Sequence, residues 1–173
     1  MKNRYAAALA ASLFVAGAGI GYAAQKVSPQ QYHGKSKDDA ARALLDMARV
    51  HAGDGSWERI AIARVLYLGG RKAEGQAMLD ALLAGDHEDS DEFRIARLYR
   101  EAGEWSRARP LFERFAANHP RDEKGLAEIG AYTLLAGDRD GAERLFDRSF
   151  GVAAEFWATV AAAGAYLGVT PEP

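Results

Sequence analysis

Apolar residues recur at helical spacing along the chain from Lys37 onward, and short polar or glycine-containing segments interrupt them. In the first such stretch, Ala40, Ala43, Leu44 and Met47 lie on one stripe, because residues three and four apart share a helix face. No run alternates β-branched and polar residues, so we expect no strand. The pattern predicts helices at residues 37–52, 56–69, 71–85, 89–102, 105–118, 122–136, 139–150 and 153–168.

The apolar pattern repeats with a fixed period of 34 residues in the second half of the chain. The recurring pairs are Ile95 and Ile129, Ala96 and Gly130, Tyr99 and Thr133, Gly103 and Gly137, Ala108 and Ala142, and Phe112 and Phe146. Glycine stands in each predicted turn within a helix pair, at Gly69-Gly70, Gly103 and Gly137, where it can adopt the left-handed conformation of a helix end. A period of this length is typical of stacked helix pairs that bury each other's apolar faces.

The segment at residues 89–122 resembles the tetratricopeptide repeat, whose pattern is W-x₂-L-G-x₂-Y…A-x₃-F…P. Its leucine, small, tyrosine, alanine, phenylalanine and proline positions hold Ile95, Ala96, Tyr99, Ala108, Phe112 and Pro120, and Glu92 replaces the tryptophan. Residues 123–154 match less completely, with Thr133 and Ala154 at the tyrosine and proline positions, and residues 56–88 match least. The resemblance implies an all-α fold, an antiparallel helix-pair solenoid of about three repeats with the 37–52 and 153–168 helices as caps.

The amino-terminal residues differ in composition from the repeats. Lys2 and Arg4 precede an apolar run at 5–24 that lacks acidic residues, and Ala23 completes a small-residue pattern that a signal peptidase recognises. We expect residues 1–23 to be a signal peptide, residues 24–36 a polar flexible linker, and residues 37–173 the repeat domain. The alternative is an uncleaved signal anchor, since a run of this length is just able to span a bilayer. The first reading predicts a periplasmic protein, and the second predicts a protein anchored in the inner membrane that faces the periplasm.

Composition and charge exclude several classes of function. The chain has no cysteine, which excludes disulfides, thiolate zinc sites and cysteine nucleophiles. Its 22 basic and 24 acidic residues give a net charge of −2, so no basic field favours nucleic acid, and loss of Lys2 and Arg4 makes the charge more negative. The four histidines lack metal-site spacing, and no nucleophile or phosphate-binding motif is present. We therefore expect no enzyme activity, no cofactor and no metal.

The resemblance to tetratricopeptide repeats also implies an inner groove, lined by the first helix of each pair. Carried over by position, the residues expected to face a partner there are Trp57, Ile60, Arg64, Tyr67, Phe93, Arg94, Arg97, Arg100 and Lys124. Arginines beside exposed aromatic residues favour a protein or peptide partner with acidic groups. The alternative is that Arg94, Arg97 and Arg100 only solvate a helix face and that Trp57 belongs to the core.

These observations predict a non-catalytic protein–protein interaction scaffold or adaptor of the bacterial cell envelope. Two alternatives stay open. One is an accessory or regulatory subunit of an envelope or secretion enzyme complex, and the other is a self-associating structural protein. In the second case we expect the contact on the 153–168 helix, whose large apolar residues are Phe156, Trp157, Val160, Tyr166 and Leu167.

Overall fold

The computed structural model describes residues 26–171, and every regular element in this range is a helix. The chain divides into two units between His51 and Ala52. The hydroxyl of Ser36 accepts a hydrogen bond from the Asp39 amide at 3.1 Å, which satisfies one of the free amides at the start of a helix. The described residues of the first unit form a short 3-10 helix, η1 (Pro29–Gln31), within the expected linker, and α2 (Lys37–Ala52).

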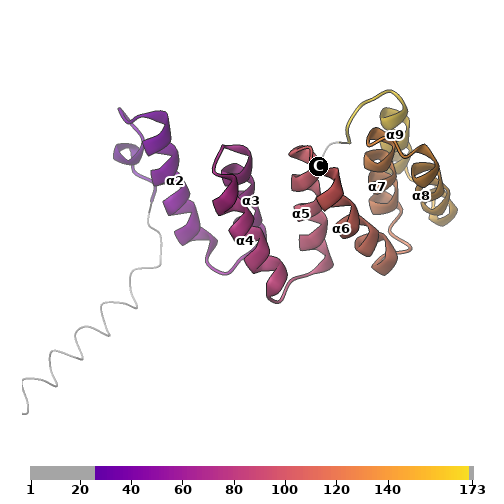
Figure 1. The fold of residues 1–173 in the computed structure, drawn as a ribbon, viewed down its shortest axis with the longest axis horizontal. Coiled ribbons are helices and arrows are strands. Elements are labelled where there is room, and N and C mark those ends of the chain that lie inside the picture. Colours follow the sequence, from indigo (N-terminus) through magenta and orange to yellow (C-terminus); the bar gives the residue numbers. More distant parts are fainter. Residues whose placement is uncertain (1–25, 172–173) are drawn as a thin grey trace, which may run out of the picture. The chain divides into compact units, whose positions relative to one another are not determined.

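The described part of the second unit is built from helices that alternate in direction along the chain (Figure 1). They are α3 (Ser56–Leu68), α4 (Lys72–Ala84), α5 (Asp89–Glu101), α6 (Trp105–Asn118), α7 (Glu123–Leu135), α8 (Arg139–Val152) and α9 (Phe156–Tyr166). Every boundary lies within three residues of the sequence prediction. The predicted all-α, helix-pair fold is therefore confirmed.

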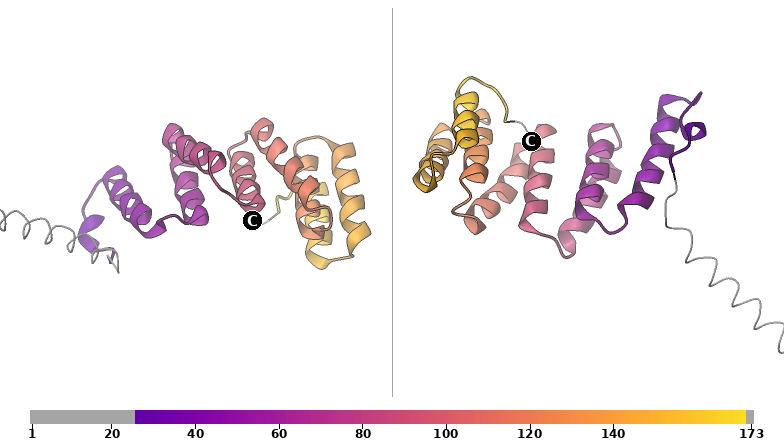
Figure 2. Two further views of the ribbon diagram at one scale, coloured as in Figure 1. Left: turned by 90° about the horizontal axis from the view of Figure 1, so that it is seen from below. Right: turned by 180° about the vertical axis from the view of Figure 1, so that it is seen from behind.

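The helices of the second unit form successive antiparallel hairpins (Figure 2). α3 packs against α4, α5 against α6, and α7 against α8, and these contacts are more extensive than those between hairpins. Between hairpins, α3 contacts α5, and α6 contacts α7. α9 follows the third hairpin and packs along α7 as extensively as α3 packs along α4, which is a closer association than that of α3 with α5.

One backbone motif ends all the first helices of the second unit. The glycine just past each of these helices has a positive φ, as predicted for the three hairpin turns: 88° at Gly70, 77° at Gly103, 94° at Gly137 and 77° at Gly168. The next amide in the chain then donates back to a carbonyl five residues earlier, as from Val169 to Gly164 at 2.8 Å. This arrangement satisfies carbonyls that the helix itself leaves free.

Small residues bring the two helices of each hairpin close together. Ala96 and Ala108 are fully buried between α5 and α6, in the positions that the repeat pattern reserves for small side chains. α3 and α4 meet at Gly75, where a Cβ atom would lie 2.7 Å from the Ala63 carbonyl oxygen and 2.8 Å from the Tyr67 amide nitrogen. The hairpin that matches the repeat pattern least is therefore closely packed at this point.

The core of the second unit runs from α3 to α9 as two adjoining clusters. The larger one spans α3 to α7 and centres on Phe112, whose ring lies 5.4 Å from the rings of both Phe93 and Tyr132. The smaller one joins α7, α8 and α9 through Phe146 and a group of alanines. This packing fixes α3, α5 and α7 side by side and so positions the side chains that they expose.

The predicted signal peptide at residues 1–23 lies outside the described residues, and so does the start of the predicted linker. Within residues 26–171, no helix combines the length and the hydropathy that a membrane crossing needs.

Candidate functional site

A cavity of about 510 Å³, which we call the inner groove, opens between the first helices of successive hairpins. Its walls combine apolar, aromatic and positively charged side chains with the chain that follows α9. The lining residues are Trp57, Ile60, Ala61 and Arg64 of α3, Arg94, Arg97, Leu98, Arg100 and Glu101 of α5, Tyr132 of α7, and Thr170 and Pro171. The structure thus brings six of the nine predicted site residues into one cavity: Trp57, Ile60, Arg64, Arg94, Arg97 and Arg100.

An exposed tryptophan and a stacked arginine form one end of the inner groove. Trp57 is 60% exposed, and the guanidinium carbon of Arg94 lies 3.5 Å from the centre of its ring. Arg94 is also held by a hydrogen bond from Nη1 to the Ser90 carbonyl oxygen at 2.9 Å. Ile60 and Leu98 are buried and form the apolar floor. The pair offers a flat apolar face and a cation side by side, as aromatic and arginine anchors do at interfaces.

Two of the groove arginines are already paired with carboxylates of the next repeat. Arg64 of α3 forms two hydrogen bonds with Glu101 of α5, one of them from Nε to Oε2 at 2.6 Å. Arg97 of α5 donates from Nε and Nη2 to the two oxygens of Glu128 on α7, both at 2.6 Å. Such two-point pairs are strong and directional. These guanidinium groups therefore join neighbouring repeats, and their charge is balanced within the protein.

The other two groove arginines, Arg94 and Arg100, form no ion pair with a carboxylate of the described residues. Arg94 keeps its charge although burial lowers its pKa, because an arginine loses its proton only far above neutral pH. Arg100 lies over the Tyr132 ring, with its guanidinium carbon 4.8 Å from the ring centre, and donates from Nη2 to Oγ1 of Thr170 at 2.6 Å. The inner groove thus has two positive charges that no carboxylate of the described residues contacts directly, although the charges of Asp91 and Glu88 act on Arg94 from a greater distance.

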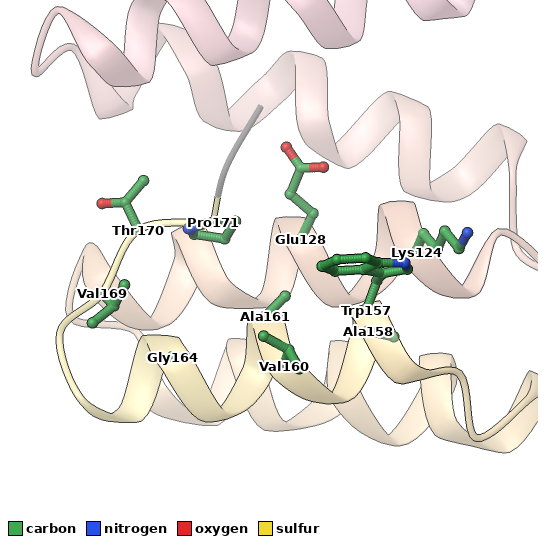
Figure 3. Close-up of a pocket in the computed structure, with 10 residues that line it drawn as sticks. All are labelled: Lys124, Glu128, Trp157, Ala158, Val160, Ala161, Gly164, Val169, Thr170 and Pro171. Carbon is green, nitrogen blue, oxygen red and sulfur yellow. The ribbon is translucent and has the colours of Figure 1, made fainter.

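The chain after α9 passes between the inner groove and a second cavity. We call residues Val169–Pro171 the tail segment. The second cavity, of about 490 Å³, lies between α7 and α9, and Thr170 and Pro171 line both cavities. Figure 3 shows the tail segment above this second cavity, with Trp157 rising from α9 toward Lys124 on α7.

Three predicted site residues lie outside the inner groove. Lys124 lines the second cavity and approaches Glu155 at 3.6 Å. Tyr67 is buried and donates a hydrogen bond from its hydroxyl to Glu104 at 2.7 Å, so it supports the core rather than the groove. Phe93 is also buried, against the ring of Phe115 at 4.4 Å, which corrects the expectation of an exposed aromatic residue at this position. The face of the Phe93 ring nevertheless lies under Arg97, whose guanidinium carbon is 4.6 Å from the ring centre, and Phe93 lines a smaller cavity between α5 and α7.

Sequence reasoning missed several residues of the inner groove. Glu101 and Tyr132 follow the helical spacing of their helices, but nothing in the sequence marks them as partners of arginines on neighbouring helices. Thr170 and Pro171 lie beyond the repeat pattern, and no periodicity predicts that they return to α5. The missed features are therefore those that depend on how one repeat stacks on the next.

Two of the histidines contact acidic residues in the first turn of α5. His87 contacts the Gly85 carbonyl oxygen through Nδ1 at 2.9 Å and Glu92 through Nε2 at 3.2 Å, and these contacts, the carbonyl first, raise its pKa. His119 contacts Asp89 through Nε2 at 2.9 Å. Among residues 26–171 there is no group of three or more histidine, aspartate and glutamate side chains arranged to hold a metal ion.

The large apolar residues of α9 lie on the surface of the second unit. Phe156 is 67% exposed, Trp157 63% and Leu167 82%. Val160 and Tyr166 are exposed as well. α9 buries its alanines against α7 instead, so its bulky side chains remain available for contact.

The fold and the groove define a class of protein: a helical-repeat protein whose first helices line an open cavity. Residues 92–122, which cover most of α5, all of α6 and the turn that follows, match the family model described as Tetratricopeptide repeat. The chain therefore carries a tetratricopeptide repeat where its sequence resembles one, and repeats of this kind generally mediate protein–protein interactions. No curated protein and no solved structure matches the chain.

Proposed function

We propose that the chain is a non-catalytic protein–protein interaction scaffold that binds an acidic segment of a partner in the inner groove. The observation that carries the proposal is the pair of arginines without a carboxylate, Arg94 and Arg100, beside the exposed ring of Trp57. A partner carboxylate supplies the direct charge-assisted hydrogen bond that these two arginines lack within the described residues. The apolar floor of Ile60 and Leu98 then accommodates an adjoining apolar side chain.

The pairing of the arginines decides which substitutions test this proposal. Changing Arg64 or Arg97 leaves Glu101 or Glu128 without its partner and so alters the stacking of the repeats. Among residues 26–171, Arg94 has no such pairing with a carboxylate, and the hydrogen bond of Arg100 is with the tail segment. The variant Arg94→Gln with Arg100→Gln therefore removes the unpaired charges with the least change to the fold.

The experiment is a crosslinking pull-down from bacterial envelope extract with the wild-type chain as bait. Proteins that bind the inner groove should be captured at least about tenfold less by Arg94→Gln/Arg100→Gln, since hydrogen bonds to charged groups contribute about 1.5–3 kcal/mol each. The matched control is Arg109→Gln with Arg139→Gln, which removes the same charge from exposed arginines that pair within their own helices. Equal capture by both variants contradicts the proposal.

The same proposal places the protein in the bacterial cell envelope, on the composition of residues 1–24. Amino-terminal sequencing of the protein from a cell fraction tests this part. A periplasmic protein that begins at Ala24 supports cleavage between Ala23 and Ala24, and a membrane fraction that retains Met1 supports the anchored alternative. A protein recovered intact from the cytoplasm contradicts both.

Self-association through α9 is a second candidate function, favoured by the exposed aromatic residues of that helix. Within the described residues α9 has no second helix to complete its hairpin. Ala43 and Met47 of α2 stand 32 residues before Gly75 and Leu79, so α2 has the register of a second helix. A second copy can supply it to α9. Light scattering after size exclusion tests this, and a strict monomer at high concentration refutes it.

A further inference from the structure

The tail segment takes a course that the repeat pattern does not provide. After Gly70, Gly103 and Gly137 the chain enters the second helix of a hairpin within two residues, at the starts of α4, α6 and α8. After Gly168, which has the same backbone conformation, no helix follows up to Pro171. The chain passes instead beside α5, where Thr170 meets Arg100 across 70 positions of sequence.

The tail segment contacts the inner groove in the way that a bound peptide would. Thr170 accepts a hydrogen bond from Arg100, which is one of the two groove arginines that form no ion pair among the described residues. Thr170 and Pro171 together line the inner groove and the second cavity. The tail segment therefore uses the same guanidinium group that the proposed function assigns to a partner.

We propose that the tail segment is an internal ligand of the inner groove, which a partner segment must displace. This inference rests on the proposed function, because it assumes that partners use Arg100. It also defines the partner more closely, as an extended segment in which a hydroxyl residue precedes proline, since Thr170 and Pro171 are the residues that line the groove.

The hold of the tail segment on the groove is weak enough to be reversed. Within the described residues one hydrogen bond joins it to the groove, from the half-buried Arg100, and Val169 is 58% exposed. A short tether gives an effective concentration on the order of millimolar, so a segment with a dissociation constant near 100 μM in trans weakens a competitor by roughly tenfold. Occupation by the tail segment thus raises the partner concentration that binding requires, but it does not block the groove.

The experiment uses a labelled peptide with the sequence of residues 168–173 and measures its binding by fluorescence anisotropy. The receptors are the full chain, a chain that ends at Val169, and the full-length variant Thr170→Val. The shortened chain keeps the Val169 amide that caps α9. The variant keeps the shape of the side chain but loses its hydrogen bond to Arg100. We expect the shortened chain to bind the peptide about tenfold more tightly than the full chain. The variant Thr170→Val should lie between them, and Arg100→Gln in the shortened chain should abolish the gain.

Equal binding of the peptide by the full and shortened chains overturns the inference, and so does a gain that survives Arg100→Gln. Circular dichroism of each receptor shows whether it is folded, and Thr170→Val tests the inference at full length if the shortened chain is not. The outcome is separable from that of the proposed function. If Arg94→Gln alone removes partners in the pull-down but the peptide does not bind, the groove is a binding site and the tail segment is not its ligand.

Discussion

Gly75 offers the sharpest test of how the first hairpin is built. A Cβ atom at this position would lie 2.7 Å from the Ala63 carbonyl oxygen, 2.8 Å from the Tyr67 amide nitrogen and 3.0 Å from the Tyr67 Cα. All three atoms belong to the α3 backbone, so no side-chain rotation relieves the contacts. Since non-bonded carbon contacts are optimal near about 3.5 Å, Gly75→Ala must move α3 and α4 apart by roughly 0.5–1 Å.

Two opposing terms set the size of the effect. Alanine is a better helix former than glycine by about 1 kcal/mol, which favours the variant. Overpacking costs about 1–3 kcal/mol, and the backbone contacts at Gly75 place it at the upper end of this range. We therefore expect Gly75→Ala to lower the free energy of unfolding by about 1–2 kcal/mol.

The matched control is Gly151→Ala. Gly151 lies in the last turn of α8, and a Cβ atom there would meet nothing within 4 Å. Only the propensity term acts at this site, so the control should be stabilised by up to about 1 kcal/mol. For a chain of this size the two variants should therefore differ in melting temperature by about 5 °C.

Urea denaturation followed by far-UV circular dichroism measures both variants, and thermal melts provide the second reading. The slope of the urea transition should stay unchanged, so that the midpoint alone reports stability. A Gly75→Ala variant as stable as Gly151→Ala refutes the reasoning, because it means that α4 moves away from α3 at no cost.

Three further predictions concern side-chain contacts. Arg97→Met should lower the free energy of unfolding by about 1–3 kcal/mol, because it leaves the Glu128 carboxylate without its two-point partner, and a double-mutant cycle with Glu128→Gln should show coupling rather than additivity. His87→Gln should remove a pH-dependent part of the stability between about pH 5 and pH 8. The hydrogen bond of His87 to a backbone carbonyl raises its pKa above the ordinary 6.5. The stability that protonated His87 contributes is therefore complete below pH 6.5 and is lost as the pH rises through the folded-state pKa. Thermal melts at both ends of the range check this. Arg94→Ala should uncover the ring of Trp57 and increase its quenching by acrylamide, and unchanged quenching means that the stacked pair does not persist in solution.

The sequence predicted the helices of the repeats well because each is encoded locally. The spacing of Ile95, Tyr99 and Phe112 gives the buried face of a hairpin, and the glycines at 70, 103 and 137 give its end. These signals act over one or two turns of helix, so they hold even where the repeat pattern is weak. Gly75 illustrates the limit, since it lies in the hairpin that matches the pattern least and yet leaves no room for a Cβ atom against α3.

The groove was predicted in part, because its residues occupy known faces of the first helices. Position on a helix face does not say whether a charge is free. The sequence does not distinguish Arg64 and Arg97 from the unpaired Arg94 and Arg100. Only the stacking of the repeats brings Glu101 to Arg64 and Glu128 to Arg97. Tyr67 and Phe93 were expected as exposed groove residues, but both are buried in the core, and Phe93 contacts Arg97 from there.

Water reaches the two cross-repeat ion pairs to different extents. The Arg64 and Glu101 side chains, which join α3 to α5, are 51% and 41% exposed, whereas those of Arg97 and Glu128, which join α5 to α7, are 29% and 14% exposed. Dissolved salt screens exposed pairs far more than sheltered ones. We therefore expect rising ionic strength to weaken the Arg64–Glu101 pair before the Arg97–Glu128 pair, while the shared core still holds the first hairpin against the second.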